Sequence, residues 1–267
     1  MTTLRKVWAV SSAYARSVWA YPGAEALRTI FLVFLVVILI VFLALWRTTY
    51  STMDTGSLGG MRLPQMLEYL AGTEAIVLSA PAFADRIGDD VRTGGLAVQL
   101  TRPISYIAFQ FAVAAGESWP RLALNLAVGS LVVALATGSV PVGPAGILAY
   151  LMAYVPAFLL YASLFLALAL TSFWLEDAWA VTFLASRSVM ILGGLLVPLS
   201  LFPPVLARIA QILPLQLMVY GPAQQLAHPF QDFGGLMLQE AIWLLVLFAL
   251  LAFIYRKGVS ALHVQGG

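Results

Sequence analysis

The sequence contains no cysteine and few charged residues. The absence of cysteine excludes a disulfide framework, a thiol nucleophile and a cysteine-ligated metal site. Charged residues make up only 10% of the 267 residues and apolar residues 61%, whereas soluble domains average about 25% and about 45–50%. This composition predicts a multi-pass membrane protein. The net charge of +2 is too small to indicate nucleic acid as a partner.

Sequence motifs of common catalytic sites are also missing. No phosphate-binding G-x-x-x-x-G-K-[ST] motif occurs, so we do not expect this chain alone to bind and hydrolyse ATP. Neither H-E-x-x-H nor G-x-S-x-G occurs. The only two histidines, His228 and His263, have no acidic cluster near them in the sequence. We therefore expect no catalytic residue, no metal site and no cofactor on this chain.

Long apolar runs are the main feature that the sequence does contain. A membrane-spanning helix needs about 20 largely apolar residues. The predicted fold is an all-α membrane protein, a single domain over residues 1–267 with six transmembrane helices. These helices are predicted at residues 25–46, 61–83, 105–137, 143–173, 178–201 and 236–255. If residues 61–83 only dip into the membrane, the number of spans falls to five.

Residues 1–22 differ in pattern from these runs. On a helix, Trp8 and Trp19 lie on one apolar face, while Arg5 and Arg16 lie on the other. This pattern is typical of an amphipathic helix in the membrane interface. A solvated helical tail is the alternative, but it would leave both tryptophans exposed.

The distribution of Lys and Arg predicts the orientation, because these residues concentrate on the cytoplasmic side of a membrane. With the N-terminus inside, nine of the 14 basic residues lie in cytoplasmic segments, three lie outside and two lie within spans. The nine are Arg5, Lys6, Arg16, Arg28, Arg86, Arg92, Arg102, Arg256 and Lys257, and the three are Arg47, Arg62 and Arg208. We therefore expect both termini in the cytoplasm, as an even number of spans requires.

A polar cytoplasmic loop is predicted at residues 85–103, between the second and third spans. Charged residues alternate there with apolar ones, a pair of glycines interrupts the pattern, and Pro103 ends it. The pattern predicts a short helix, a glycine turn and a second short helix that lies along the membrane. Such an element can present side chains to a soluble partner. An ordinary solvated loop is the alternative.

Prolines interrupt the apolar sequence from the end of the fifth span through residues 202–235. They stand at Pro198, Pro203, Pro214 and Pro222, and proline removes helical hydrogen bonds. Non-helical backbone at membrane depth must be buried in protein or line a wet cavity. We therefore expect two short re-entrant or interfacial helices on the outer side, with a long apolar outer loop as the alternative.

Five charged residues are singled out within the predicted spans: Glu68, Glu74, Glu117, Arg121 and Arg187. Intramembrane charges are costly and usually face a cavity or a partner. Glu117 and Arg121 are four residues apart and can pair on one helix face, so a structural ion pair is favoured over a transport role. Glu68 and Glu74 are six apart and cannot share a face. One of them lines a path or meets Arg187.

These features together resemble the permease subunits of bacterial ABC-2-type transporters, in particular the group known as ABC-2 family transporter proteins. The resemblance covers nearly the whole chain, and six spans with both termini inside fit it. The residues that carry it are Ile87 through Gly94-Gly95-Leu96 to Leu100-Thr101-Arg102-Pro103, the proline series with Gly194, and Tyr255-Arg256-Lys257-Gly258 leading to the C-terminal glycines. In this group an acidic residue often precedes the arginine that matches Arg92, and Asp89 and Asp90 are interchangeable candidates for it.

The resemblance implies partners and a location. Two permease subunits would pair, as a homodimer or, preferably, as a heterodimer of related permeases. Each would contact an ATP-binding subunit that holds ATP and Mg²⁺. Lipids of the bacterial cytoplasmic membrane would surround the pair.

The resemblance also implies site residues. The loop 85–103 would be the coupling helix, which transmits closure of the ATP-binding subunits to the spans. Its expected contact residues are Ile87, Asp89, Asp90, Val91, Arg92, Gly94, Leu96 and Arg102. Pro198, Pro203, Pro214 and Pro222 would form the outer gate.

Two other functions are weighed against the permease of an ATP-driven exporter. An intramembrane lipid-modifying enzyme would need polar catalytic side chains clustered at one interface, and the sequence offers no such cluster. A non-transporting membrane assembly factor would need neither the loop 85–103 nor the proline-interrupted segment. The exporter permease is therefore the favoured interpretation, with the enzyme and the assembly factor as alternatives.

The predicted orientation is testable with reporter fusions at each end of the chain. Because the basic residues are distributed nine to three, we expect a cytoplasmic reporter signal at both termini. An external signal at either end would refute the six-span arrangement.

Overall fold

The computed structural model describes residues 3–20, 22–52, 56–93, 95, 99, 101–138, 142–175 and 178–265. This part of the chain forms helices and turns and contains no β-strand, so the all-α class is confirmed. The long helices are α1 (Thr3–Ala20), α2 (Pro22–Ser51), α6 (Tyr106–Thr137), α7 (Pro144–Ala169) and α12 (Phe233–Gln265). The shorter ones are α3 (Leu63–Leu78), α4 (Phe83–Arg92), α8 (Trp179–Leu192), α9 (Pro204–Ile212), α10 (Leu215–Met218) and α11 (Tyr220–Ala227), with the 3-10 turns η1 (Leu170–Phe173) and η2 (Leu199–Leu201).

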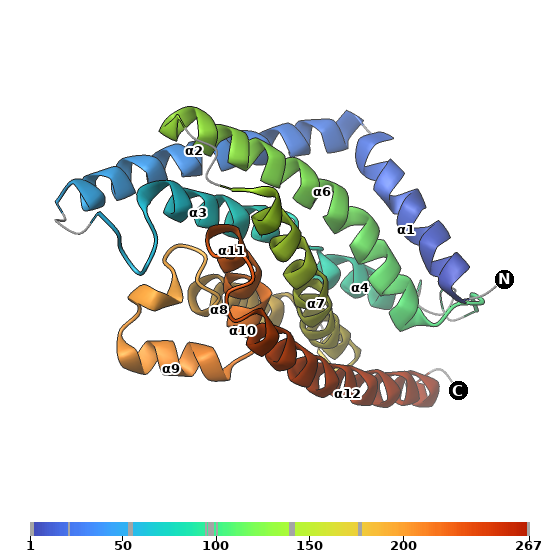
Figure 1. Cartoon of the computed structure of the whole chain (residues 1–267). Coiled ribbons are helices and arrows are strands. Elements are labelled where there is room, and N and C mark those ends of the chain that lie inside the picture. Colours follow the sequence, from blue (N-terminus) through green and yellow to red (C-terminus); the bar gives the residue numbers. More distant parts are fainter. Residues whose placement is uncertain are drawn as a thin grey trace.

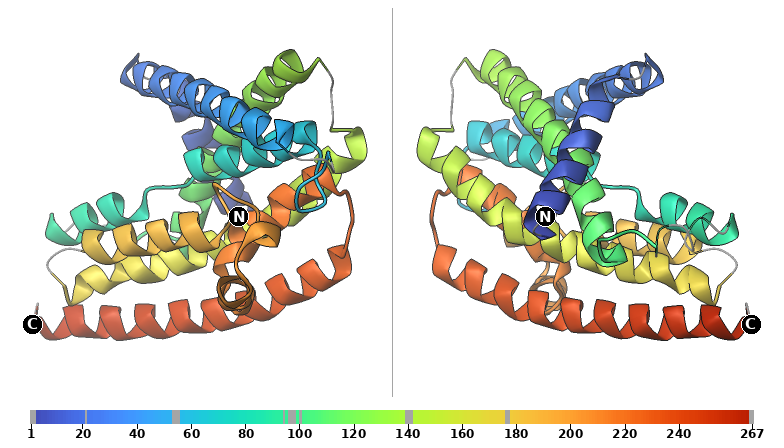
Figure 2. Two further views of the ribbon diagram at one scale, coloured as in Figure 1. Left: turned by 90° about the vertical axis from the view of Figure 1, so that its left-hand side faces the viewer. Right: turned by 90° about the vertical axis from the view of Figure 1, so that its right-hand side faces the viewer.

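Helix α7 is the centre of the arrangement. It lies between α12 on one side and the group of α2, α3 and α6 on the other (Figures 1 and 2), and it contacts α4, α8, α10, α11 and α12. One face of α7 carries Ala149, Ala153 and Ala157, four residues apart and fully buried. Small residues let membrane helices approach closely, which replaces the hydrophobic driving force that lipid cannot supply.

Among the described residues, four helical segments are long and apolar enough to cross a membrane: Thr29–Ser51, Tyr106–Thr137, Pro144–Phe173 and Phe233–Val259. They correspond to the first, third, fourth and sixth predicted spans. The second and fifth predicted spans contain shorter helices, α3 with 16 residues and α8 with 14. At 1.5 Å per residue these reach only about 21 to 24 Å, less than the hydrocarbon core of about 30 Å. The multi-pass helical class is confirmed, and the number of six spans stays a prediction.

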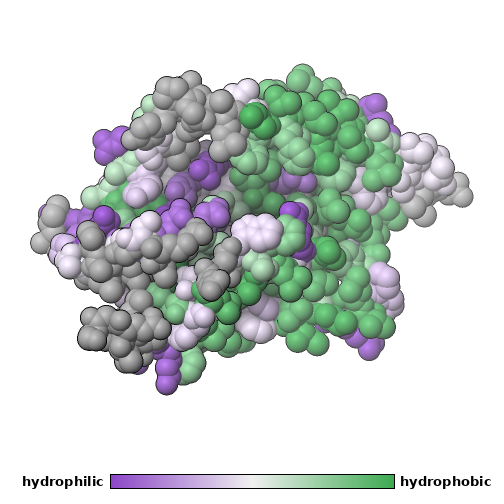
Figure 3. All heavy atoms as spheres, turned by 180° about the vertical axis from the view of Figure 1, so that it is seen from behind, coloured by the Kyte–Doolittle hydropathy of each residue, from purple (hydrophilic) through white to green (hydrophobic). Residues whose placement is uncertain are grey.

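The surface of the long helices is apolar. Val37 and Val41 on α2 and Leu245 on α12 are among the exposed large side chains. Figure 3 shows hydrophobic residues over the middle and right of one face, with hydrophilic residues gathered mainly toward its left. The first residues of α1 and the last residues of α12 lie at the same end of the molecule as α4 (Figure 1). An extended apolar surface of this kind fits contact with lipid.

Helix α1 packs along the first half of α6. Tyr14 meets Phe109 edge-on, with ring centroids 6.4 Å apart, while Leu4 and Trp8 are 81% and 75% exposed. Residues 3–20 are helical, and the amphipathic interfacial role of residues 1–22 stays a prediction.

The short helices between α8 and α12 begin at prolines. Pro198, Pro203 and Pro214 directly precede η2, α9 and α10, and Pro222 lies in the first turn of α11. Proline fits there because the first N–H groups of a helix have no helical acceptor. Three short helices therefore stand where the sequence predicts two. The additional one, α10, has only four residues, too few to give a periodic pattern.

The packing of α1 on α6 predicts the effect of a methyl group at Gly116. A Cβ there would lie 2.4 Å from the backbone oxygen of Ser11 and 2.9 Å from Tyr14 Cβ. Gly116→Ala must therefore displace α1, and we expect a loss of about 1–3 kcal/mol in the free energy of unfolding. Thermal unfolding of the purified chain measures it.

The matched control is Gly234→Ala, near the start of α12. Nothing lies within 4 Å of a Cβ at Gly234, and alanine favours a helix over glycine by up to about 1 kcal/mol. If the Gly116 and Gly234 variants are equally stable, α1 does not pack on α6 in this way.

Candidate functional site

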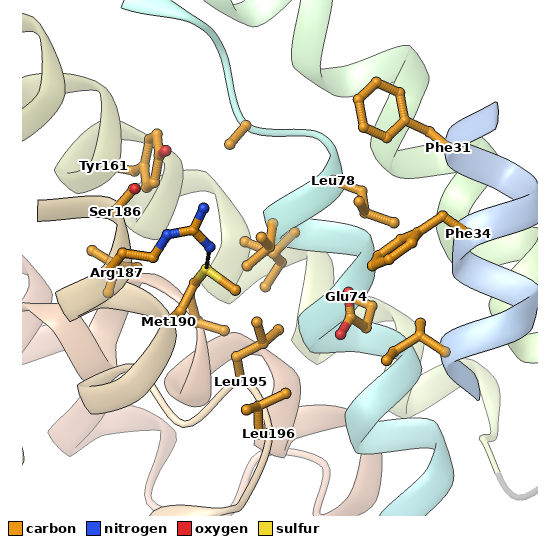
Figure 4. A pocket seen from close by; sticks show the side chains of 16 residues that line it. Phe31, Phe34, Glu74, Leu78, Tyr161, Ser186, Arg187, Met190, Leu195 and Leu196 are labelled. Atoms are coloured by element: carbon orange, nitrogen blue, oxygen red, sulfur yellow. Dashed lines mark hydrogen bonds between the residues drawn. The ribbon is translucent and has the colours of Figure 1, made fainter. Parts of the chain in front are cut away.

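A cavity of about 540 Å³ lies between α2, α3, α7 and α8. Its lining is mostly apolar, and Figure 4 labels Phe31 and Phe34 from α2, Leu78 from α3, and Leu195 and Leu196 from the segment after α8. Small-molecule sites typically have about 300–1,000 Å³ and an apolar lining with a few placed polar groups. By size and lining this cavity is the candidate binding site.

Two side chains of opposite charge line the cavity, Glu74 from α3 and Arg187 from α8. Figure 4 draws them on opposite sides of the space. Glu74 is only 4% exposed. The Arg187 guanidinium donates to Met190 Sδ at 3.1 Å and lies 4.7 Å from the Phe183 ring centroid. No ion pair joins the two charges in the part of the chain that the structure describes, so both are placed to meet a polar group in the cavity.

Glu68 lies on a different face of α3 from Glu74. Ser130 of α6 donates its hydroxyl to Glu68 Oε2 over 3.1 Å. The two glutamates thus diverge, as their six-residue spacing predicts. Of the two predicted alternatives, Glu74 is the one that shares a cavity with Arg187.

A further buried carboxyl, Glu240 of α12, is absent from the five predicted intramembrane charges. Its side chain is 0% exposed, and neither of its carboxylate oxygens has a hydrogen-bond partner among the described residues. The signal in the sequence is the same one that selects Glu68, an acidic residue inside a predicted span, here residues 236–255.

Helix α4 is tied to α6 at the end of the molecule where α1 begins. Arg86 of α4 donates from Nε to Gln110 Oε1 over 2.9 Å and from Nη1 to Glu117 Oε1 over 3.0 Å. Its guanidinium also lies 5.5 Å from the Phe83 ring centroid. The planar guanidinium holds two acceptors in a fixed geometry, so α4 and α6 are connected at a defined position.

The predicted ion pair between Glu117 and Arg121 is wrong. Glu117 pairs with Arg86, which is the one ion pair found among the described residues. An i, i+4 pair on one helix contributes only about 0.3–0.5 kcal/mol. Arg86 gains more, because Gln110 and Glu117 both accept from it and both side chains of the ion pair are about four-fifths covered. Glu117 therefore pairs with Arg86 on α4 and not with Arg121 on its own helix.

The predicted coupling residues on and after α4 differ in burial. Ile87 is fully buried in the core, so the structure turns it away from any partner. Asp90 is half-buried and accepts from Gln99 Nε2 over 2.6 Å. Burial raises the pKa of the Asp90 carboxyl, while the bond from Gln99 and the nearby Arg86 and Arg102 oppose this shift.

The other members of the coupling set are only partly described. Asp89 is exposed on α4, and the guanidinium of Arg102 lies 4.7 Å from the ring centroid of Phe109 on α6. The side chains of Val91 and Arg92, and Gly94 and Leu96 as a whole, lie outside the described residues. Their contacts with a partner stay a prediction.

Comparison with known proteins gives one family. A family model described as ABC-2 family transporter protein matches residues 34–266. No curated protein and no solved structure matches the chain. The match includes α4, the short helices α9 to α11 and every lining residue of the cavity except Phe31, and it confirms the resemblance that the sequence indicates.

The contact between Arg86 and Glu117 predicts an energetic coupling that a double-mutant cycle measures. Arg86→Ala and Glu117→Ala should each lower the free energy of unfolding by about 1–3 kcal/mol, since each leaves a partly buried group without its partner. The double variant should lose less than the sum, because the shared contact is lost once.

The control for this cycle is Arg121→Ala, on the same helix and one turn from Glu117. Its effect should simply add to that of Glu117→Ala. If instead the effects of Glu117→Ala and Arg121→Ala are coupled while those of Glu117→Ala and Arg86→Ala add, Glu117 pairs with Arg121 and not with Arg86.

Proposed function

The chain belongs to the ABC-2 transporter family, and on that premise we propose that it is the transmembrane permease subunit of an ATP-driven exporter. Membership makes the chain a membrane-embedded transport component, and this family implies partnership with an ABC ATP-binding subunit in general. The family match carries the proposal, because it covers both the cavity and α4. Coupling to ATP, the outward direction and the subunit assembly are the finer parts of the proposal.

In this proposal α4 is the coupling helix. Phe83 and Ile87 hold it in the core, while Asp85 and Asp89 are exposed. A helix with one buried apolar face and one polar face suits contact with a soluble subunit. In this proposal the ATP-binding subunit holds ATP and Mg²⁺, and this chain itself binds no cofactor.

Closure of the ATP-binding subunits displaces α4, and the Arg86 contacts pass the displacement to α6. Because α6 packs on α2 and α3, which line the cavity, movement of α6 changes the cavity. This is a single mechanical connection from a cytoplasmic surface to a site at membrane depth.

The cavity is proposed as part of the transport path. Its apolar lining with Glu74 and Arg187 suits an amphiphilic cargo that carries a polar group. In this proposal the short helices that start at Pro198, Pro203 and Pro214 serve as the outer gate together with Pro222. A second permease, preferably related and not identical, completes the path in the bacterial cytoplasmic membrane.

We retain six spans in this proposal, with α3 and α8 as the short second and fifth spans. Both termini then lie in the cytoplasm. The first residues of α1 and the last residues of α12 lie at the same end of the molecule as α4 in Figure 1, which supports this arrangement.

The test is co-purification with the P-loop protein encoded in a neighbouring reading frame, followed by measurement of ATP turnover. We expect Leu96→Asp to dissociate or uncouple the complex and Arg92→Ala only to weaken it, since apolar anchors contribute more than rim charges. The permease alone should show background ATP turnover.

A charge change at the other end of the molecule is the control. Arg208→Asp on α9, an exposed position, should leave both co-purification and turnover unchanged. If Leu96→Asp keeps both at the wild-type level, residues 85–103 are a solvated loop and do not couple this chain to an ATPase.

A further inference from the structure

A second cavity, of about 280 Å³, lies on the other side of the break between α10 and α11. Val219 at this break lines the apolar cavity, and its neighbour Tyr220 lines the second one. The second cavity is open on one side and is lined by residues of α9, α10 and α11, of the turn between α11 and α12, and of the first turns of α12. It belongs to the outer part of the molecule in the six-span arrangement.

Glutamine dominates the lining of this cavity. Six of the ten glutamines in the chain contribute to it: Gln211, Gln216, Gln224, Gln225, Gln231 and Gln239. Each side-chain amide offers two donors and one acceptor without a net charge. Such a set can bond several hydroxyl groups at once, because every hydroxyl also both donates and accepts.

The amides are poorly satisfied by one another. Gln216 Nε2 donates to Gln239 Oε1 over 3.4 Å, and Gln225 Nε2 donates to the backbone oxygen of Gln231 over 3.3 Å. Both distances exceed the usual 2.7–3.2 Å. Gln225 is 2% exposed, and its Oε1 has no hydrogen-bond partner among the described residues. A bound hydroxyl would supply the partner that this buried amide lacks.

The charges around this cavity indicate a neutral ligand. No Lys or Arg is among its described lining residues, so an anion would find no counter-charge. The one carboxylate, Asp232, directly precedes α12, and its oxygens lie against Gly235. There it faces the positive end of the helix dipole. A divalent cation such as Ca²⁺ needs about six to eight oxygen ligands, and these carry more negative charge than the single carboxylate of Asp232 provides.

We propose that the cavity lined by the six glutamines binds a neutral, hydroxyl-rich group, such as a sugar or polyol. The volume of about 280 Å³ holds roughly nine water molecules at about 30 Å³ each. This is enough for one ring of a saccharide, with any further ring outside the open side of the cavity, and too little for a whole amphiphile. Tyr220 and Leu236 add apolar surface, which the C–H face of a sugar ring can contact. The group comes either from a free saccharide or from the head of a glycolipid.

The test uses the full chain in phosphatidylcholine nanodiscs, prepared in a detergent that has no sugar or polyether head. Saturation-transfer NMR measures the binding of maltose, with inorganic phosphate as the anionic probe. We expect saturable binding of maltose and none of phosphate. Because binding is measured without ATP or a partner, its failure is separate from any failure of the transport role.

The double variant Gln224→Met and Gln239→Met removes two amides while it keeps the side-chain volume. Gln239 is exposed and Gln224 partly so, so the fold should survive, and thermal unfolding checks it. We expect a loss of maltose affinity of about thirtyfold, which corresponds to the removal of two hydrogen bonds of about 1 kcal/mol each. The matched control is Gln99→Met, far from the cavity in the loop after α4, which should bind as the wild type does.

Addition of a monoglucosyl diacylglycerol to the nanodiscs separates the two sources. Displacement of maltose by this lipid assigns the pocket to a glycolipid head, and unchanged maltose binding assigns it to a free saccharide. Two results would overturn the proposal: no saturable binding of maltose, or equal maltose affinity in the wild type and the folded double variant. In either case the cavity holds water only.

Discussion

Backbone polar groups cannot face lipid without a cost of several kcal/mol each, and this constraint governs the structure between α8 and α12. The chain there leaves the helical conformation repeatedly, so its carbonyl groups need partners from elsewhere. Helix α3 supplies two of them, because Tyr69 donates its hydroxyl to the Gly194 carbonyl and Thr73 donates to the Leu195 carbonyl over 3.1 Å. Contacts with α3 thus satisfy polar backbone groups that could not face the bilayer.

The same constraint explains why cavities occur here. Short helices joined by non-helical residues pack less continuously than long ones, and the break at Val219 has an apolar cavity on one side and a glutamine-lined cavity on the other. Helix α4 meets a similar demand at the other end, since its partly buried arginine needs acceptors and finds Gln110 and Glu117 on α6. The need to enclose polar groups thus accounts for the two cavities and for the contact of Arg86 on α4 with Gln110 and Glu117 on α6.

Local patterns in the sequence predict local structure. Long apolar runs predict α2, α6, α7 and α12, and Pro203 and Pro214 mark helix starts, because these signals depend only on neighbouring residues. Contacts between elements escape prediction. Glu117 has a suitable partner one turn away on its own helix and still pairs with an arginine 31 positions earlier. The six glutamines show no spacing pattern between residues 211 and 239, since only the folding of α9 to α12 brings them together.

In the proposed transport cycle, α4 and α6 move as one body and thereby change the cavity between α2 and α8. The chain has no cysteine, so pairs of introduced cysteines can carry spin labels for distance measurement in the complex with the ATP-binding subunit. One pair, Asp85→Cys with Ala123→Cys, spans α4 and α6, and the other, Phe34→Cys with Leu184→Cys, spans the cavity; all four positions are exposed. On binding of ATP the first distance should stay constant while the second changes. A change in the first distance with a constant second distance would show that α4 and α6 do not move together.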